Sequence, residues 1–369
     1  MTDRKKTIFF FISSKHEFFE FTKILKKINL KNQKLYLLIE NSERNQNIEF
    51  NFNSNINIIF LPNIYPSKNL LKNILLKKEI IKILKNLNFC KDDLFIYFHN
   101  GSLLFFIVYL FFNKYNLKKI MFVTSNFVVP NDNSKISFKE TFLLNILSYP
   151  LLNIIVYKKY FVGTVFKNTY IKQKIDYVIC LKNEISFTKT KTFNIESYFV
   201  KQNKTHVNEP KYLILVVSYW INKFSSYKDT VKFLISKHGK KNVLIKDHPL
   251  SNLNDIDLIN IFSIDKENII PKQISLENYI ENNQNNFKLI YGPTSAALKY
   301  ASFMGLDVIC YQNLFSNNLA YNKHTLEYFK FHGKVKIISK LSNNTFTYEN
   351  RKIFHSVEHK LEEVFHKIL

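Results

Sequence analysis

Short apolar runs separated by amphipathic stretches recur along the chain, and this alternation constrains the fold more than any other feature. In the first half, the runs with strand composition are 7–13, 34–40, 56–62, 93–98, 119–125 and 174–181. Helical stretches lie between them, at 15–28, at 68–87 and from 103 onward. Strands that alternate with helices form a parallel sheet covered on both faces. The first half therefore predicts one Rossmann-like α/β domain.

A second alternating series follows the polar run 200–210, which carries charge, Asn and a closing Pro without periodicity and is the best candidate linker. Its predicted strands are 211–220, 268–271 and 306–311, together with a strand and loop at 242–249 and a strand and turn at 287–295. Its predicted helices are 226–239, 275–283 and 295–305. The last 20 residues of the sequence predict a closing helix. We therefore expect an α/β fold of the GT-B arrangement, with two Rossmann-like domains at 1–200 and 211–350, a cleft between them, and the closing helix at 351–369.

The positive charge of the chain reflects in part its overall composition. The formal net charge is +24, but Lys, Asn, Ile and Phe are all abundant, as an AT-rich genome would encode. Arg, which binds phosphate through a planar fork, is scarce, and the lysines are spread along the chain. We therefore expect no nucleic-acid partner. An anionic membrane surface, contacted peripherally, or anionic substrates fit the charge better.

Cysteine use and the longest apolar runs indicate a cytoplasmic protein. Cys90, Cys180 and Cys310 are widely spaced and form no CxxC pair, which argues against a zinc site and a disulfide framework. The apolar run Ile8 to Ile12 is too short for a signal peptide, and the run 103–112 is half the length that spans a bilayer.

The aromatic and basic segment 137–170 favours a pair of core helices over a helix on the membrane surface. Three roles stay open for it: lining an acceptor site, contacting the membrane, or pairing with a second copy of the chain in a homodimer.

Polar clusters follow three predicted strands. The first, His99-Asn100-Gly101-Ser102, places a histidine just past a strand, where Gly101 permits a tight turn. A lone histidine is more often structural than catalytic, so its position is what makes His99 a candidate. No Walker loop, GxGxxG, HExxH or GxSxG motif occurs, which argues against the P-loop, dinucleotide, zincin and serine-hydrolase classes.

The second cluster is Lys246-Asp247-His248-Pro249. Pro249 restricts His248 to an extended backbone and thereby fixes the direction of the imidazole, and Lys246 is a cation at a strand end. Together these residues suit a negatively charged leaving group, although an ordinary turn has the same local sequence.

The third cluster is "YGPTSAAL", residues 291–298. Gly292 and Pro293 make a turn, and a helix begins directly after Thr294 and Ser295, as at sites where a helix N-terminus binds phosphate. An ordinary N-cap looks the same locally. Between the second and third clusters lies Glu277, which by itself would be a solvated helix residue.

The ordered set formed by His248-Pro249, Glu277 and Thr294-Ser295, with the turn at Gly101 upstream, resembles the bacterial GT-B sialyltransferases. Those enzymes carry a D/E-D/E-G motif in the N-terminal domain, then an HP motif and a Ser/Thr motif. Here 29 residues separate His248 from Glu277 and 18 separate Glu277 from Ser295, close to the family's layout. The resemblance covers 93–112 and 211–311, and only the combination of its short motifs is specific.

The resemblance implies a role for each matching residue. His248, Thr294 and Ser295 would bind the phosphate of a CMP-activated sugar, and Glu277 would hold the ribose. Lys246, Pro249 and Gly292 complete the donor site. The family's general base corresponds to His99, a departure because the motif here lacks a carboxylate; a neutral imidazole is a competent base for a sugar hydroxyl.

The implied activity is an inverting, metal-independent transfer of sialic acid, a related nonulosonic acid or Kdo. The acceptor would be a glycan of bacterial lipooligosaccharide or capsule, held by the N-terminal domain, and no cofactor is implied beyond the CMP-sugar donor. The alternative is a CDP-glycerol or CDP-ribitol phosphotransferase of teichoic-acid type, which also uses an HP motif and a histidine base. The position of Glu277 favours the first interpretation.

Overall fold

The computed structural model describes residues 5–28, 30, 33–41, 56–64, 70–98, 103–123, 175–181, 191–196, 210–248, 251, 253–315, 325–326, 329, 334–342, 345–350 and 358–369. The chain divides into two compact units, Met1–Tyr198 with Ser356–Leu369, and Phe199–His355. The segment 137–170 lies outside the described residues, as do His99, Gly101 and Pro249.

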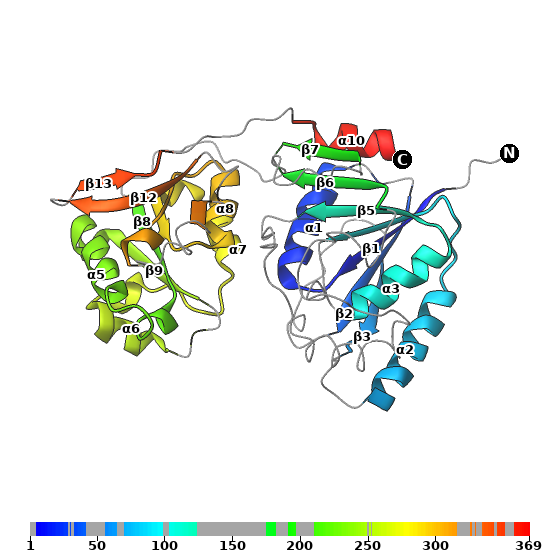
Figure 1. Cartoon of the computed structure of the whole chain (residues 1–369), viewed down its shortest axis with the longest axis horizontal. Coiled ribbons are helices and arrows are strands. Elements are labelled where there is room, and N and C mark those ends of the chain that lie inside the picture. The colour runs from blue at the N-terminus through cyan, green and yellow to red at the C-terminus, as the bar shows by residue number, and fades with distance from the viewer. Residues whose placement is uncertain are drawn as a thin grey trace, which may run out of the picture. The chain divides into compact units, whose positions relative to one another are not determined.

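The first unit is built on a seven-stranded parallel sheet in the order β3-β2-β1-β4-β5-β6-β7 (Figure 1). Its strands are β1 (Thr7–Ile12), β2 (Lys34–Asn41), β3 (Ile56–Pro62), β4 (Leu94–Phe98), β5 (Lys118–Val123), β6 (Tyr177–Leu181) and β7 (Lys191–Ile195). Its helices are α1 (Lys15–Lys27), α2 (Leu70–Lys85), α3 (Leu103–Lys114) and α10 (Leu361–Ile368).

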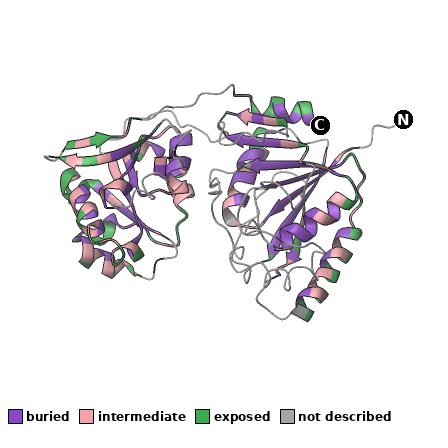
Figure 2. Ribbon diagram, viewed as in Figure 1, coloured by how far each residue is buried: buried purple, intermediate pink, exposed green. Residues whose placement is uncertain are grey.

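Both faces of this sheet are covered, so its central strands are apolar throughout. All six residues of β1 are buried. Phe9 and Phe11 belong to the core cluster that α2 and α3 complete, whereas Phe10 packs on Phe21 of α1 on the other face. Figure 2 shows the resulting buried layer. The very apolar run at 103–112 is therefore a core helix of this unit.

The end of the chain belongs to the first unit. His359 forms a parallel bridge with Ile195 and exchanges backbone hydrogen bonds with Asn194 and Glu196, both at the β7 edge. The helix α10 that follows contacts α1, and Phe365 stacks on Phe122 of β5.

The second unit contains a six-stranded sheet in the order β13-β12-β11-β10-β8-β9, parallel except for the β12–β13 hairpin. Its strands are β8 (Lys211–Val216), β9 (Val243–Asp247), β10 (Phe287–Gly292), β11 (Val308–Cys310), β12 (Val335–Ser342) and β13 (Thr345–Tyr348). Its helices are α5 (Tyr227–His238), α6 (Asp255–Phe262), α7 (Leu276–Asn282) and α8 (Ala296–Phe303). The helices α5 and α6 complete the core on one face. The helix α8 packs on β10 and β11, and α7 packs on α8.

The predicted fold class, two parallel α/β units, is confirmed. Alternation alone did not predict β7, α6 or the β12–β13 hairpin. The predicted strand 268–271 is only a single parallel bridge between Ile269 and Ile245. The predicted strand 211–220 ends early, because the chain leaves the sheet after Val216 and forms a 3-10 turn, η2 (Ser218–Trp220).

Within the described ranges, no helix combines the length and the apolar composition that crossing a membrane requires.

The buried carboxylate of Asp93 is expected to stabilise the first unit. Its two oxygens accept hydrogen bonds from the backbone N–H groups of Thr7 and Cys90, each at 2.8 Å, and so join the start of β1 to the turn before β4. Asp93→Ala should lower the free energy of unfolding by roughly 1–3 kcal/mol, because it leaves one buried and one part-buried donor without their acceptor. Urea unfolding followed by circular dichroism measures this loss. Asp92→Ala is the matched control, since Asp92 is exposed, and an equal effect of the two variants would contradict the prediction.

Candidate functional site

The strands β8 and β9 leave the second sheet side by side, and the carboxylate of Asp247 joins their ends. Asp247 is buried and accepts hydrogen bonds from the N–H of Ser218 (3.0 Å), the hydroxyl of Ser218 (2.6 Å) and the N–H of His248 (2.8 Å). These bonds turn the chain out of the sheet after β8. Because β8 lies between β9 and β10, this is the point where the strand order reverses, at which open α/β sheets bind ligands.

His248 has a fixed backbone and a half-buried ring. Its N–H also donates to the carbonyl of Val216, and its carbonyl accepts from the N–H of Ser251, each at 3.0 Å. The ring meets the half-exposed ring of Tyr219 edge to face, with centroids 6.0 Å apart. Burial lowers the pKa of His248 below its ordinary value, and Lys246 lowers it further against the opposing effect of Asp247. The imidazole is therefore neutral at pH 7.

Glu277 reaches the same edge of the sheet from α7. The bridge at Ile269 runs parallel to β9, so the following residues emerge at the carboxyl edge, where Lys272 donates to the carbonyls of Ser251 and Leu253. This cation ties the loop after His248 to the segment that enters α7. Glu277 lies half-buried in the first turn of α7 and accepts from the hydroxyl of Ser275 (2.9 Å).

Lys246 differs from a simple strand-end cation. Its side chain is buried, and its ammonium lies 3.4 Å from the carbonyl of Lys272 and 3.5 Å from that of Asp247. Burial lowers the pKa of Lys246. Among the nearby charges, Asp247 opposes this shift most, Lys272 adds to it, and Asp255 and Glu277 also act to raise the pKa. In this conformation the ammonium is engaged by two carbonyl groups of the protein.

The turn after β10 brings α8 very close to the sheet at Gly292. A Cβ atom at this position would lie 3.0 Å from Leu298 and 3.2 Å from Leu215. Glycine therefore lets the first turn of α8 approach the end of β8. This close approach places the start of the helix beside the Asp247 network.

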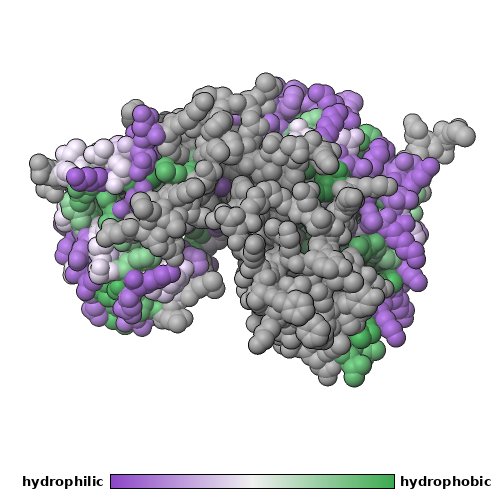
Figure 3. Space-filling view, in the orientation of Figure 1, coloured by the Kyte–Doolittle hydropathy of each residue, from purple (hydrophilic) through white to green (hydrophobic). Residues whose placement is uncertain are grey.

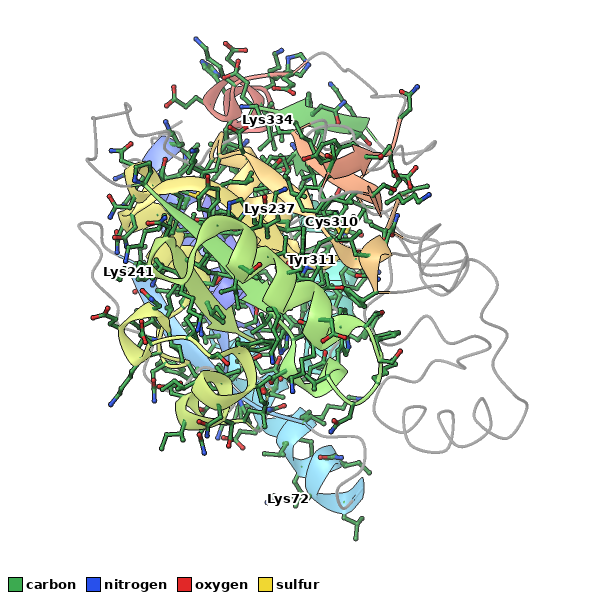
Figure 4. All side chains as sticks on the ribbon, turned by 90° about the vertical axis from the view of Figure 1, so that its left-hand side faces the viewer. Lys72, Lys237, Lys241, Cys310, Tyr311 and Lys334 are labelled. Atoms are coloured by element: carbon green, nitrogen blue, oxygen red, sulfur yellow. The ribbon has the colours of Figure 1, made fainter. Side chains whose placement is uncertain are left out.

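Thr294 and Ser295 have different environments despite their similar chemistry. The N–H of Thr294 donates to the side-chain carbonyl of Gln312 (2.8 Å), and its hydroxyl pairs with that of Thr325 (2.9 Å). The N–H of Thr294 is therefore engaged by Gln312, which follows β11 (Figure 4 labels the neighbouring Tyr311), and does not point to a ligand.

Ser295 is the N-cap of α8, yet its hydroxyl makes no capping hydrogen bond. The oxygen is buried and has no hydrogen-bond partner among the residues that the structure describes. Buried hydroxyls are nearly always paired, so an orphaned one at a helix N-terminus indicates a place for a ligand acceptor or a water.

The carboxyl edge of the second sheet therefore collects His248, Lys246, Glu277, Gly292 and Ser295 in one unit, with Thr294 engaged beside them. Sequence reasoning missed Ser218 and Tyr219 because 211–220 was interpreted as one strand. Pro249 and His99 lie outside the described residues.

A second polar cluster lies at the carboxyl edge of the first sheet and was also missed. Glu17, in the first turn of α1, accepts from the N–H (2.6 Å) and the hydroxyl (3.0 Å) of Ser13. Burial is the main cause that raises the pKa of Glu17 to about 7; the hydrogen bonds from Ser13 and the charge of His16 act in the opposite direction, and Glu40 at the end of β2 raises it. The sequence signal was an acid three residues after the N-cap Ser14.

Over the described ranges, no group of three or more His, Cys, Asp and Glu side chains is arranged to hold a metal ion.

Comparison with known proteins shows the fold. No protein-family model matches the chain, and no curated protein matches it either. The UDP-GlcNAc 2-epimerase from Methanocaldococcus jannaschii superposes with a TM-score of 0.53 and 10% identity, over 98% of this chain and 99% of that one. A UDP-glucosyltransferase from Polygonum tinctorium superposes with a TM-score of 0.51 and 8% identity, over 93% and 87%. The chain therefore has the GT-B fold, which these two enzymes share.

The contrast between Ser295 and Thr294 gives a test of the orphaned hydroxyl. Ser295→Ala should leave the stability of the second unit unchanged within about 0.5 kcal/mol or raise it, because the buried hydroxyl has no described partner to lose. Thr294→Val should cost about 1 kcal/mol, since its hydroxyl is paired. The fluorescence of Trp220, the single tryptophan of the chain, reports unfolding of this unit in urea. A larger loss for Ser295→Ala than for Thr294→Val would show that the hydroxyl is paired in solution.

Proposed function

We propose that the protein is a glycosyltransferase whose nucleotide-sugar donor binds at the carboxyl edge of the second sheet. The observation that supports it most is the buried, unpartnered hydroxyl of Ser295 at the start of α8. It lies at the point where the strand order reverses, on the same edge as His248. The GT-B fold agrees with this activity but is shared with epimerases, so the proposal rests on the site.

The donor we propose is a CMP-activated nonulosonic acid or Kdo. A single phosphate between His248 and the N-terminus of α8 would accept from the hydroxyl and backbone of Ser295 and from the imidazole. Since β8 separates β9 from β10, the backbones of these two strands end about 10 Å apart across the end of β8, and the side chains that follow them would close on the phosphate from either side. Glu277 would accept from the ribose hydroxyls.

In the reaction, an acceptor hydroxyl attacks the anomeric carbon while the bond from that carbon to the phosphate oxygen breaks. CMP leaves with the bonding electrons, the configuration inverts, and a base takes the hydroxyl proton. His248, neutral in the absence of ligand, gains favourable charge if it becomes protonated beside the leaving phosphate.

We assign the base to His99, the residue that follows β4 in the sequence. One alternative has a specific observation in its favour. Glu17 follows β1, which is the neighbour of β4 in the sheet, and its pKa of about 7 suits a base near neutral pH. A carboxylate from α1 would then supply what the His-Asn-Gly sequence lacks.

Release of CMP tests the donor class. Wild-type protein with CMP-sialic acid and a lactose-type acceptor should release CMP, and His248→Ala should lower kcat/KM on the order of a hundredfold, because the leaving phosphate loses a partner. Turnover of UDP-GlcNAc without an acceptor would instead identify an epimerase. Turnover of CDP-glycerol without any CMP release would favour the teichoic-acid alternative.

The same assay separates the two candidates for the base. Loss of turnover in His99→Ala with retention in Glu17→Gln supports His99, and the reverse pattern assigns the base to α1. Folding of each variant is checked by circular dichroism.

Donor binding should depend on pH through His248. The pKa of His248 is lowered in the ligand-free protein, and a bound phosphate raises it, so binding takes up a proton. Affinity for an unreactive CMP-sugar should therefore rise as the pH falls below the raised pKa of the complex and level off below the pKa of the ligand-free protein. Calorimetric titration measures the dissociation constant across this range. His248→Asn should bind with little dependence on pH, and an unchanged dependence in that variant would exclude His248 as the proton acceptor.

A further inference from the structure

The outer face of α2 carries exposed leucines beside exposed lysines, two features that soluble proteins rarely place together. Leu71 and Leu75 are 73% and 63% exposed, and they lie one turn apart on the same side of the helix. Figure 3 shows hydrophobic side chains gathered at the lower end of α2, with hydrophilic ones along its outer side. The inner face carries the fully buried Ile80 and Leu84, so the helix is held on the sheet without the two exposed leucines.

Lysines continue the stripe that these leucines begin. At 100° per residue, Lys78, Lys82 and Lys85 lie within about 40° of the line through Leu71, opposite the buried face. All three are exposed, as is Lys72 in the first turn, which Figure 4 shows at the far end of the helix. Glu79 is the one exposed acid among the described residues of α2, and no acid occupies its first turn. The exposed face is therefore apolar at its N-terminal end and basic behind it.

We propose that the N-terminal end of α2 docks on an anionic lipid bilayer. In this arrangement Leu71 and Leu75 enter the boundary between headgroups and acyl chains, and Lys72 and Lys78 lie among the lipid phosphates. Lys82 stands about 10 Å behind Leu75 along the helix axis, close to one Debye length, so it still contributes attraction.

Two other occupants fit this surface less well. A second copy of the chain would place lysines opposite lysines around a symmetric contact and repel. The centre of a protein interface is also depleted in lysine, whereas here lysines directly border the two leucines. An anionic bilayer suits both the leucines and the lysines of this surface, since the apolar side chains insert while the cations remain at the lipid phosphates. The helix is also too short, and its outer face too charged, to cross the membrane.

This surface is distinct from the segment 137–170, which the sequence analysis considered for membrane contact. The proposal does not depend on the nucleotide-sugar site. Docking would bring the first unit to a membrane on which a lipid-linked glycan acceptor is presented, but vesicle binding can be measured without any turnover.

The test is co-sedimentation of the full chain with vesicles containing about 30% phosphatidylglycerol, at about 0.15 M salt. Leu71→Ser with Leu75→Ser should lower the partition coefficient on the order of tenfold or more, because two apolar side chains no longer insert. Lys78→Gln and Lys82→Gln should each lower it roughly fivefold. Ile256→Ser is the matched control: Ile256 is 67% exposed, but it stands between Asp255 and Asp257 on α6, so its loss should change nothing.

A spectroscopic readout separates insertion from charge attraction alone, which a chain with a net charge of +24 could show anywhere on its surface. Leu75→Trp should add an emission band that shifts to the blue with anionic vesicles, whereas the native Trp220 should not shift. The absence of such a shift, or equal binding by wild type and the double leucine variant, would overturn the proposal. So would a dimer or a nucleic-acid complex that the double leucine variant abolishes. CMP release in solution by the leucine variants should equal that of wild type, so a failure here leaves the proposed function standing.

Discussion

The geometry of the candidate site in the second unit depends on the hydrogen bonds that the carboxylate of Asp247 accepts. It is buried at the end of β9, yet three hydrogen bonds from Ser218 and His248 satisfy it. Burying a carboxylate is unfavourable unless donors replace the lost water, so the chain after β8 must turn toward it. That turn places Tyr219 outward and leaves His248 with a fixed backbone. One acid therefore determines the orientation of two neighbouring strand ends.

The parallel sheet explains why much of the molecule could be predicted from the sequence. Strands covered on both faces are nearly continuous apolar runs, as β1 is from Ile8 to Ile12, and such runs are easily recognised. The elements that were missed lack this signal. The strand β7 has only two buried residues, and β13 lies in a hairpin with mostly exposed side chains. Their positions are determined by pairing with β6 and β12, and the local periodicity of β7 and β13 contains no record of these contacts.

The candidate site, like the fold, could be predicted from the sequence only in part. The sequence placed His248, Glu277 and Ser295 correctly at strand ends or helix starts, because glycine, proline and polar residues mark those points. It could not distinguish Ser295 from Thr294, which are adjacent and chemically similar. Their difference arises from Gln312 and Thr325, which follow in the chain and bind only Thr294. It also could not reveal that Lys246 turns inward, since that depends on carbonyls supplied by another segment.

The two sheets share an arrangement that bears on the question of the base. In each, the first strand lies between strands that follow it in sequence, so β1 and β8 both occupy the point of reversal. In the second unit, the carboxylate at that point is Asp247, which accepts three hydrogen bonds and has a structural role. In the first it carries Glu17, whose pKa is raised to about 7 because burial outweighs its two hydrogen bonds from Ser13. A carboxyl group with this pKa exchanges its proton near neutral pH, whereas Asp247 is held by three donors. The physical environment of Glu17 is therefore what makes it the alternative to His99 as the base.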